Sequence, residues 1–131
     1  MIKATDLMIG DWVQIVPDAP VMPNEYHRID WIRTGEIGLD NRKIVTYPYI
    51  QPIPLTPEIL EDNGWVKGDG YYCYRLCDAE RLEYWLDDWR LERIWAGKGD
   101  KYLVTFRAFV SCVHTLQHAL KLCGIDKEIT L

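Results

Sequence analysis

Hydrophobic and polar residues alternate in short runs over the first third of the chain. A proline-rich loop at 17–23 and a glycine turn at 35–38 separate these runs, which are rich in β-branched and aromatic residues. Short alternating runs between Gly, Pro and Asn clusters are typical of β-strands. The pattern predicts a strongly bent β unit over residues 1–54, an SH3-like small barrel. The predicted strands are 12–16, 26–32 and 43–47.

The clearest helix signal lies at residues 55–64. Thr56 is a good capping residue, Pro57 suits the first helical turn, and Gly64 can adopt the left-handed conformation that ends a helix. The segment therefore predicts a short connecting helix without catalytic residues.

Residues 65–106 contain four further aromatic and aliphatic runs at hairpin-like separations. This spacing predicts an antiparallel β-meander. Apolar residues within 80–95 also fit helical spacing, so a helix there is the alternative. The density of Trp, Tyr and Ile favours strands. The predicted strands are 71–76, 81–86, 90–95 and 102–107.

A helical pattern follows over 110–122, and Gly124 is placed to end it. The tail 125–131 alternates and predicts a final edge strand. The apolar stripe of the helix, spaced to pack on the meander, consists of Val113, Leu116, Leu120 and Cys123.

These elements predict an α+β fold with two parts. The first is the SH3-like β unit at 1–54, and the second, at 55–131, joins the meander and the C-terminal helix. We expect them to pack together as one compact protein, because 131 residues suffice for one domain or two small subdomains.

Charge and composition narrow the choice of partner. The net charge of -5 and the pI near 5.1 argue against nonspecific nucleic-acid binding, which needs a basic face. No basic leader with an apolar segment opens the chain, and no run approaches the ~18 apolar residues of a membrane span. We therefore expect a cytoplasmic protein with free thiols at its four cysteines.

Two histidines lie four residues apart on the predicted C-terminal helix. His114 and His118 share one face, as do the zinc ligands of H-E-x-x-H peptidases. Thr115 replaces the catalytic Glu, and Cys112 is expected on the opposite side of the helix, so the motif is incomplete. The favoured interpretation is a polar helix face that includes His114, Gln117 and His118. A metal-dependent hydrolase with His114 and His118 as ligands is the alternative.

Aromatic residues suggest a contact surface. The chain has six Trp and eight Tyr against two Phe, and small β-barrels bind peptides or single-stranded nucleic acids on exposed rings. The alternative is that most of these rings fill the core. The candidate rings are Trp12, Tyr26, Trp31, Tyr47 and Tyr49.

Three segments together carry a resemblance. They are 6–13, 52–65 and 109–124, in the same order along nearly the whole chain. The chain resembles a group of small proteins of Bacteroides-type gut bacteria, often encoded in phage or mobile-element contexts. The resemblance implies a bacterial, cytoplasmic protein and no activity that could be assigned residue by residue.

No complete catalytic set is present: the chain has neither a G-x-S-x-G motif nor a phosphate-binding glycine loop. We therefore expect a non-enzymatic interaction protein, without a cofactor, that contacts a protein partner. A nucleic-acid partner is possible but disfavoured, and a membrane is not expected. The candidate binding residues are Trp12, Tyr26, Trp31, Tyr47, His114, Gln117 and His118.

Overall fold

The chain forms two compact units. Unit 1 comprises Met1–Pro54 with Cys112–His114, and unit 2 comprises Leu55–Ser111 with Thr115–Leu131. The chain passes from unit 1 to unit 2 after Pro54, and the segment Cys112–His114 belongs to unit 1 again. The computed structural model describes residues 6–67, 73–75, 80–85, 88–96 and 102–131.

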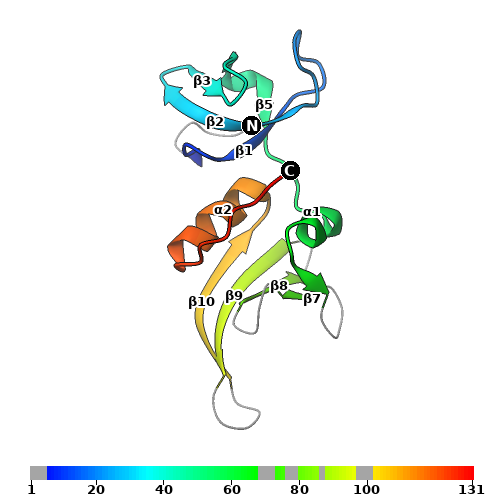
Figure 1. Cartoon of the computed structure of the whole chain (residues 1–131), viewed down its shortest axis with the longest axis vertical. Helices are drawn as coiled ribbons and strands as arrows, with labels where there is room; N and C mark the ends of the chain where they lie inside the picture. Colours follow the sequence, from blue (N-terminus) through cyan, green and yellow to red (C-terminus); the bar gives the residue numbers. More distant parts are fainter. Residues whose placement is uncertain (1–5, 68–72, 76–79, 86–87, 97–101) are drawn as a thin grey trace. The chain divides into compact units, whose positions relative to one another are not determined.

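Unit 1 contains one antiparallel sheet of five short strands in the order β4-β3-β2-β1-β5. Its elements run from blue to cyan-green in Figure 1. The inner face of the sheet buries the core of the unit. The elements are β1 (Trp12–Ile15), β2 (Tyr26–Arg33), β3 (Glu36–Leu39), β4 (Ile44–Thr46), a 3-10 helix η2 (Tyr47–Tyr49) and β5 (Ile50–Gln51). The core residues are Leu7, Val13, Ile15, Ala19, Ile29, Ile37, Leu39, Val45 and Ile50.

Strands β1, β2 and β4 coincide with the three predicted runs, but β3 occupies the stretch predicted as a turn. Arg33 pairs with Glu36, so the real turn is only two residues long and has Gly35 at φ 82°. Gly38 is a strand residue. A Cβ at Gly38 would collide with the indole of Trp31, its cross-strand partner, so this glycine makes room for a ring.

A bulge in β2 determines which side chains point inward. Ile29 pairs with Leu39, yet Trp31 pairs with the very next residue of β3, Gly38. Two residues apart on a regular strand, Ile29 and Trp31 would share a face. Because Asp30 is the extra residue, Ile29 lies in the core while Trp31 lies on the outer face.

The sheet of unit 1 has two edges. β4 stands at one end of the strand order and β5 at the other, and no strand pairing among the described residues closes the sheet into a barrel. Unit 1 is therefore a small antiparallel β unit, and its sheet is open between β4 and β5.

Unit 2 contains a second antiparallel sheet of five strands, in the order β10-β9-β8-β7-β6. Every strand pairs with its neighbour in sequence, so the sheet is the predicted meander (Figure 1). The helix considered for 80–95 is wrong, because this stretch contains two paired strands. The strands are β6 (Val66–Lys67), β7 (Cys73–Arg75), β8 (Glu80–Trp85), β9 (Asp88–Ala96) and β10 (Tyr102–Val110).

Two helices complete the described part of the chain, α1 (Pro57–Asp62) and α2 (Val113–Leu122). The predicted cap is confirmed: the Thr56 hydroxyl accepts a bond from the Ile59 N–H at 3.3 Å. Both helices end in a Schellman motif at a left-handed glycine, Gly64 and Gly124. Neither helix is long and apolar enough to cross a membrane.

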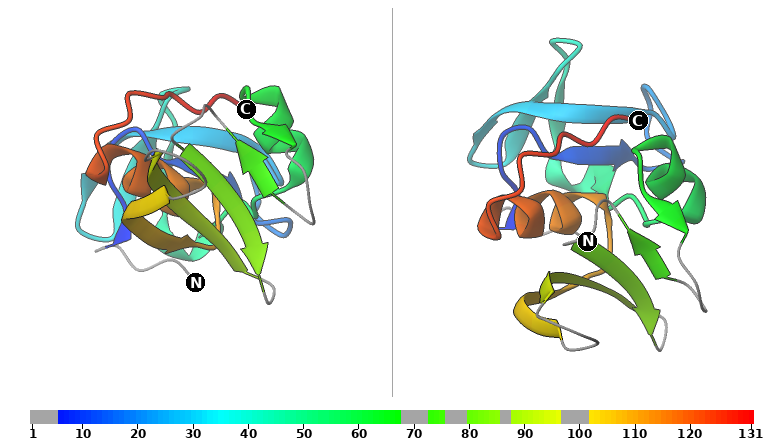
Figure 2. Two further views of the ribbon diagram at one scale, coloured as in Figure 1. Left: turned by 90° about the horizontal axis from the view of Figure 1, so that it is seen from below. Right: turned by 60° about the horizontal axis from the view of Figure 1, so that its bottom comes forward.

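The tail at 125–131 is not a strand, so the predicted edge strand is wrong. The side chain of Asn63 takes the place of a strand partner for Thr130. Its Nδ2 donates to the Thr130 carbonyl at 2.9 Å, and its Oδ1 accepts from the Thr130 N–H at 2.7 Å. The tail ends beside α1 in both views of Figure 2. One buried amide and the buried Ile129 thus anchor the C-terminus.

We expect Asn63→Ala to lower the free energy of unfolding by about 1–3 kcal/mol, because it removes the buried amide that bonds both the N–H and the carbonyl of Thr130. Urea denaturation measures the change. The matched control is Thr130→Ala, which keeps the backbone groups and should cost less than about 0.5 kcal/mol. Equal losses in the two variants would contradict this role of Asn63.

Candidate functional site

A groove opens in unit 1 between the β1–β2 connection and the edge strand β4. Residues 19–21 of the proline-rich loop form one wall, and Ile44, Val45 and Thr46 form the other. Ile15 and Tyr49 complete the lining. Apart from the Thr46 and Tyr49 hydroxyls, the side chains of this groove are apolar.

Large apolar side chains around the groove are exposed. Val21 is 58%, Ile44 54% and Tyr49 41% exposed. The volume of the groove is about 210 Å³. An apolar cavity of roughly 150 Å³ holds a benzene-sized group, whereas sites for drug-sized molecules usually measure about 300–1,000 Å³. The groove therefore fits one large apolar side chain better than a cofactor.

Backbone strain is concentrated in the two connections beside the groove. Met22 and Asn24 in the β1–β2 connection have φ values of 55° and 65°, and Arg42 in the β3–β4 connection has 66°. These are all the non-glycine residues with positive φ in the described part of the chain. Such residues cost about 1–2 kcal/mol each and persist where surrounding contacts hold them.

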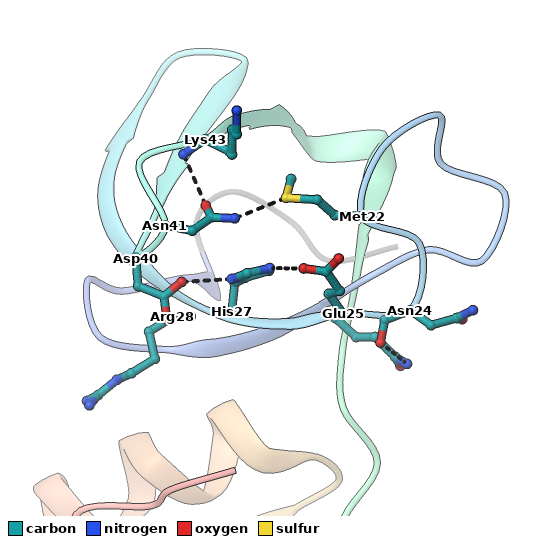
Figure 3. Close-up of polar contacts among 9 residues, drawn as sticks. Met22, Asn24, Glu25, His27, Arg28, Asp40, Asn41 and Lys43 are labelled. Atoms are coloured by element: carbon teal, nitrogen blue, oxygen red, sulfur yellow. Dashed lines mark hydrogen bonds and ion pairs between the residues drawn. The ribbon is translucent and has the colours of Figure 1, made fainter.

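Polar contacts tie these two connections together (Figure 3). The Asn41 Nδ2 lies 3.1 Å from the Met22 Sδ, and the Asn41 Oδ1 accepts from the Lys43 N–H at 3.0 Å. The Gln14 Nε2 donates to the Asn24 carbonyl at 3.3 Å. The strained segments are therefore held by contacts with each other and with β1.

His27 lies between two carboxylates at the centre of this network. Its Nδ1 is 2.8 Å from Asp40 Oδ1, and its Nε2 is 2.9 Å from Glu25 Oε1. The side chain is only 12% exposed. A neutral imidazole has one N–H and an imidazolium has two. Both contacts are therefore hydrogen bonds to ionised carboxylates only when the ring carries two protons.

The same network changes the acidity of Asp40. Partial burial acts to raise the pKa of this carboxyl, but the bonds from the His27 ring and from the Arg28 N–H outweigh it. The Arg28 N–H donates to Asp40 Oδ2 at 3.2 Å. The net result is a pKa below the ordinary value of 3.8.

The four aromatic candidates at the N-terminus lie on β1, β2 and η2, and three of them have structural contacts. Trp12 lies under the Arg28 guanidinium at 5.7 Å, and Trp31 under that of Arg33 at 4.3 Å. Tyr47 packs against the core, and its hydroxyl donates to the Arg33 carbonyl at 3.1 Å. Tyr26 is exposed. Among the predicted rings, Tyr49 is the one that lines the groove.

The polar helix face predicted around the two C-terminal histidines is wrong for two of its members. His114 is 5% and Gln117 7% exposed, whereas His118 is partly exposed. An amphipathic pattern identifies the face that must be buried, but it does not show that the other faces stay in water. Gln117 and His114 are therefore buried polar residues of α2.

Cys112 is in contact with His114, contrary to the sequence expectation. It precedes α2 and pairs with Pro54 in an isolated β-bridge, so helical geometry does not apply to it. Its Sγ lies 3.2 Å from Nδ1 and 3.8 Å from Nε2 of His114. The thiol is therefore within hydrogen-bond distance of the His114 ring, with Nδ1 the nearer nitrogen. Burial acts to lower the pKa of His114, but Cys112, Asp11 and Asp6 raise it above its ordinary value.

The described residues contain no group of three or more His, Cys, Asp or Glu that could hold a metal ion. Within the described part of the chain, His114 and His118 thus belong to no three-ligand metal group. Thr115, at the position of the peptidase base, accepts a bond from the Ser111 N–H at 3.1 Å and so supports the start of α2. Cys112 and Cys123 are free thiols, while the side chains of Cys73 and Cys77 lie outside the described part.

Sequence reasoning missed the main residues of the groove and its network. Val21 and Ile44 are ordinary apolar residues beside a loop, and His27 lies in a predicted strand without a motif. A weak signal existed: Val21 is a large apolar residue inside a proline-rich loop, where burial is not required. Nothing in the spacing of Glu25, His27 and Asp40 indicates that they meet.

Comparisons of the chain with models of protein families, with curated proteins and with solved structures find no match.

We expect Arg42→Gly to stabilise unit 1 by about 0.5–1 kcal/mol. Arg42 occupies the left-handed position of a three-residue hairpin loop, where glycine is favoured. Relief of about 1–2 kcal/mol of strain outweighs the entropic cost of glycine, about 0.5–1 kcal/mol. Thermal and urea unfolding measure the change. Arg42→Ala, which keeps the Cβ, should give no gain; an equal gain would contradict the strain argument.

Acid should remove the stabilisation that Asp40 provides. Because its folded-state pKa is lowered, this contribution is present above about pH 4, the usual aspartate range, and is lost as the pH falls through the folded-state value. Urea unfolding from neutral to acidic pH measures it. Asp40→Asn should be less stable at neutral pH and lose less on acidification, whereas Asp30→Asn, at an exposed carboxylate of β2, should resemble wild type.

Proposed function

We propose that this chain is a non-enzymatic interaction protein that binds an extended segment of a protein partner in the groove of unit 1. The observation that carries the proposal is the clustering of Val21, Ile44 and Tyr49 around a hollow of about 210 Å³. Exposed apolar patches of this kind are characteristic of contact sites. The anchor of the partner is one large apolar side chain, such as leucine or phenylalanine.

The edge strand beside the groove supports an extended partner. β4 is at the end of the strand order, and all three of its residues line the groove. Extended peptides bind edge strands through backbone hydrogen bonds, while pockets select alternate side chains. Because β4 has only three residues, we propose a short recognised segment in which the anchor side chain provides most of the selectivity.

We also propose that unit 1 is an SH3-like small barrel. Five short antiparallel strands, the register shift of β2 at Asp30 and the pairing of β1 with β5 support this assignment. The resemblance described above adds a cytoplasmic setting in a bacterium, with a phage or mobile-element gene. The net charge of -5 makes a protein partner a better proposal than a nucleic acid.

Selection from a random peptide display library on purified full-length protein tests the groove. We expect enriched peptides to share one large apolar residue. Val21→Asp and Ile44→Asp should each weaken binding at least about tenfold, or roughly 1.4 kcal/mol, because a charge would be buried against the anchor. Fluorescence anisotropy with a labelled selected peptide measures the affinity.

The matched control is Val66→Asp, which places the same charge at an exposed valine of unit 2. It should bind like wild type. Peptides that bind the groove variants with unchanged affinity would overturn the proposal, as would a protein that enriches no peptide but retains single-stranded DNA.

A further inference from the structure

His27 is the residue whose protonation state could change the contacts beside the groove. It pairs with Val13 in the register of β1 and β2, so its side chain lies on the core side of the sheet, at the rim. Glu25 reaches it from the β1–β2 connection and Asp40 from the β3–β4 connection. These are the connections on either side of the groove.

No other described charge contacts the ring. β1 presents the apolar Val13 opposite it. Arg28 touches Asp40 through its backbone N–H, and its guanidinium points away from His27, as does the Lys43 side chain (Figure 3). The proton state of the network therefore depends on one imidazole and two carboxylates.

Loss of one proton from the ring would leave one contact without a hydrogen atom. A lone pair of the ring would then face a carboxylate oxygen at about 3 Å, so the attractive contact would become a repulsive one. Asp40 keeps its bond from the Arg28 N–H, whereas His27 is the one side-chain partner of Glu25 among the described residues. Glu25 is therefore the carboxylate that would leave.

Glu25 directly follows the strained part of the β1–β2 connection. Asn24, which precedes Glu25, has a φ of 65°. The Glu25 N–H donates to the carbonyl of Met22, which has a φ of 55°. Release of Glu25 would remove a contact that holds this strain, so the connection would relax. Residues 19–21 of the same connection form one wall of the groove.

We propose that Glu25, His27 and Asp40 form a proton-operated clasp that holds the groove wall in place when His27 is an imidazolium and releases it when His27 is neutral. Its effect on a partner rests on the proposed function: peptide affinity should be lower at about pH 8 than at about pH 5.5. The release of the groove wall requires no partner, so it can be measured on the protein without peptide.

Hydrogen exchange of the backbone amides of residues 18–25, measured by NMR without peptide, tests the clasp. After correction for the intrinsic pH dependence of exchange, protection should be at least about tenfold lower at about pH 8 than at about pH 5.5. The best reporter is the Asn24 N–H, which donates to the Ile15 carbonyl at 3.0 Å. Unchanged protection would overturn the proposal.

Two variants assign the effect to the clasp. His27→Gln has no titrating ring and should show the same protection at both pH values. Glu25→Gln can donate its amide N–H to a neutral ring, so the wall should stay protected at about pH 8. A wild-type response in either variant would count against the clasp.

The other histidines provide the controls, because His114 also titrates in unit 1. His114→Gln and His118→Gln should keep the wild-type response of the wall. If His114→Gln alone abolishes it, the clasp is refuted. A pH-dependent wall in a protein that binds no peptide would support the clasp and overturn the proposed function, so the two proposals can fail separately.

Discussion

The register between β1 and β2 is the constraint on which the rest of unit 1 depends. Because Val13 and Ile15 must be buried, the residue that pairs with Val13 also faces inward, and that residue is His27. A titratable ring thus lies at the rim of an apolar core, where its polar atoms need partners. Glu25 and Asp40 supply them, and in doing so they draw together the connections that flank the groove.

The groove and the polar network beside it share the β1–β2 connection. The apolar wall belongs to a connection with an unfavourable backbone, in which Met22 and Asn24 lie in the left-handed region. Short-range polar contacts maintain that backbone, since a loop of this length has few buried apolar side chains to hold it. The shape of the groove wall and the proposed recognition therefore depend on the same few bonds.

The sequence pattern predicted elements well where the signal was local. The runs at β1, β2 and β4, the Thr56 cap and the glycine ends of both helices need only neighbouring residues to be recognised. The prediction failed where a residue distant in the sequence, rather than a neighbouring one, determines the local structure. The tail alternates like a strand, but the Asn63 amide is its partner, and Gly38 resembles a turn residue only until the ring of Trp31 is placed over it.

The sequence by itself determined the α+β class, the order of the two parts and most of the strands, because periodicity and capping act within a few residues. Only the tertiary structure decided that His114 and Gln117 are buried, that Cys112 touches His114, and that Val21 meets Ile44 and Tyr49 across a groove. It also decided that Glu25, His27 and Asp40 meet. These relations depend on strand register and loop path, which no local pattern encodes, so the chemistry of the candidate site emerges only when the chain is folded.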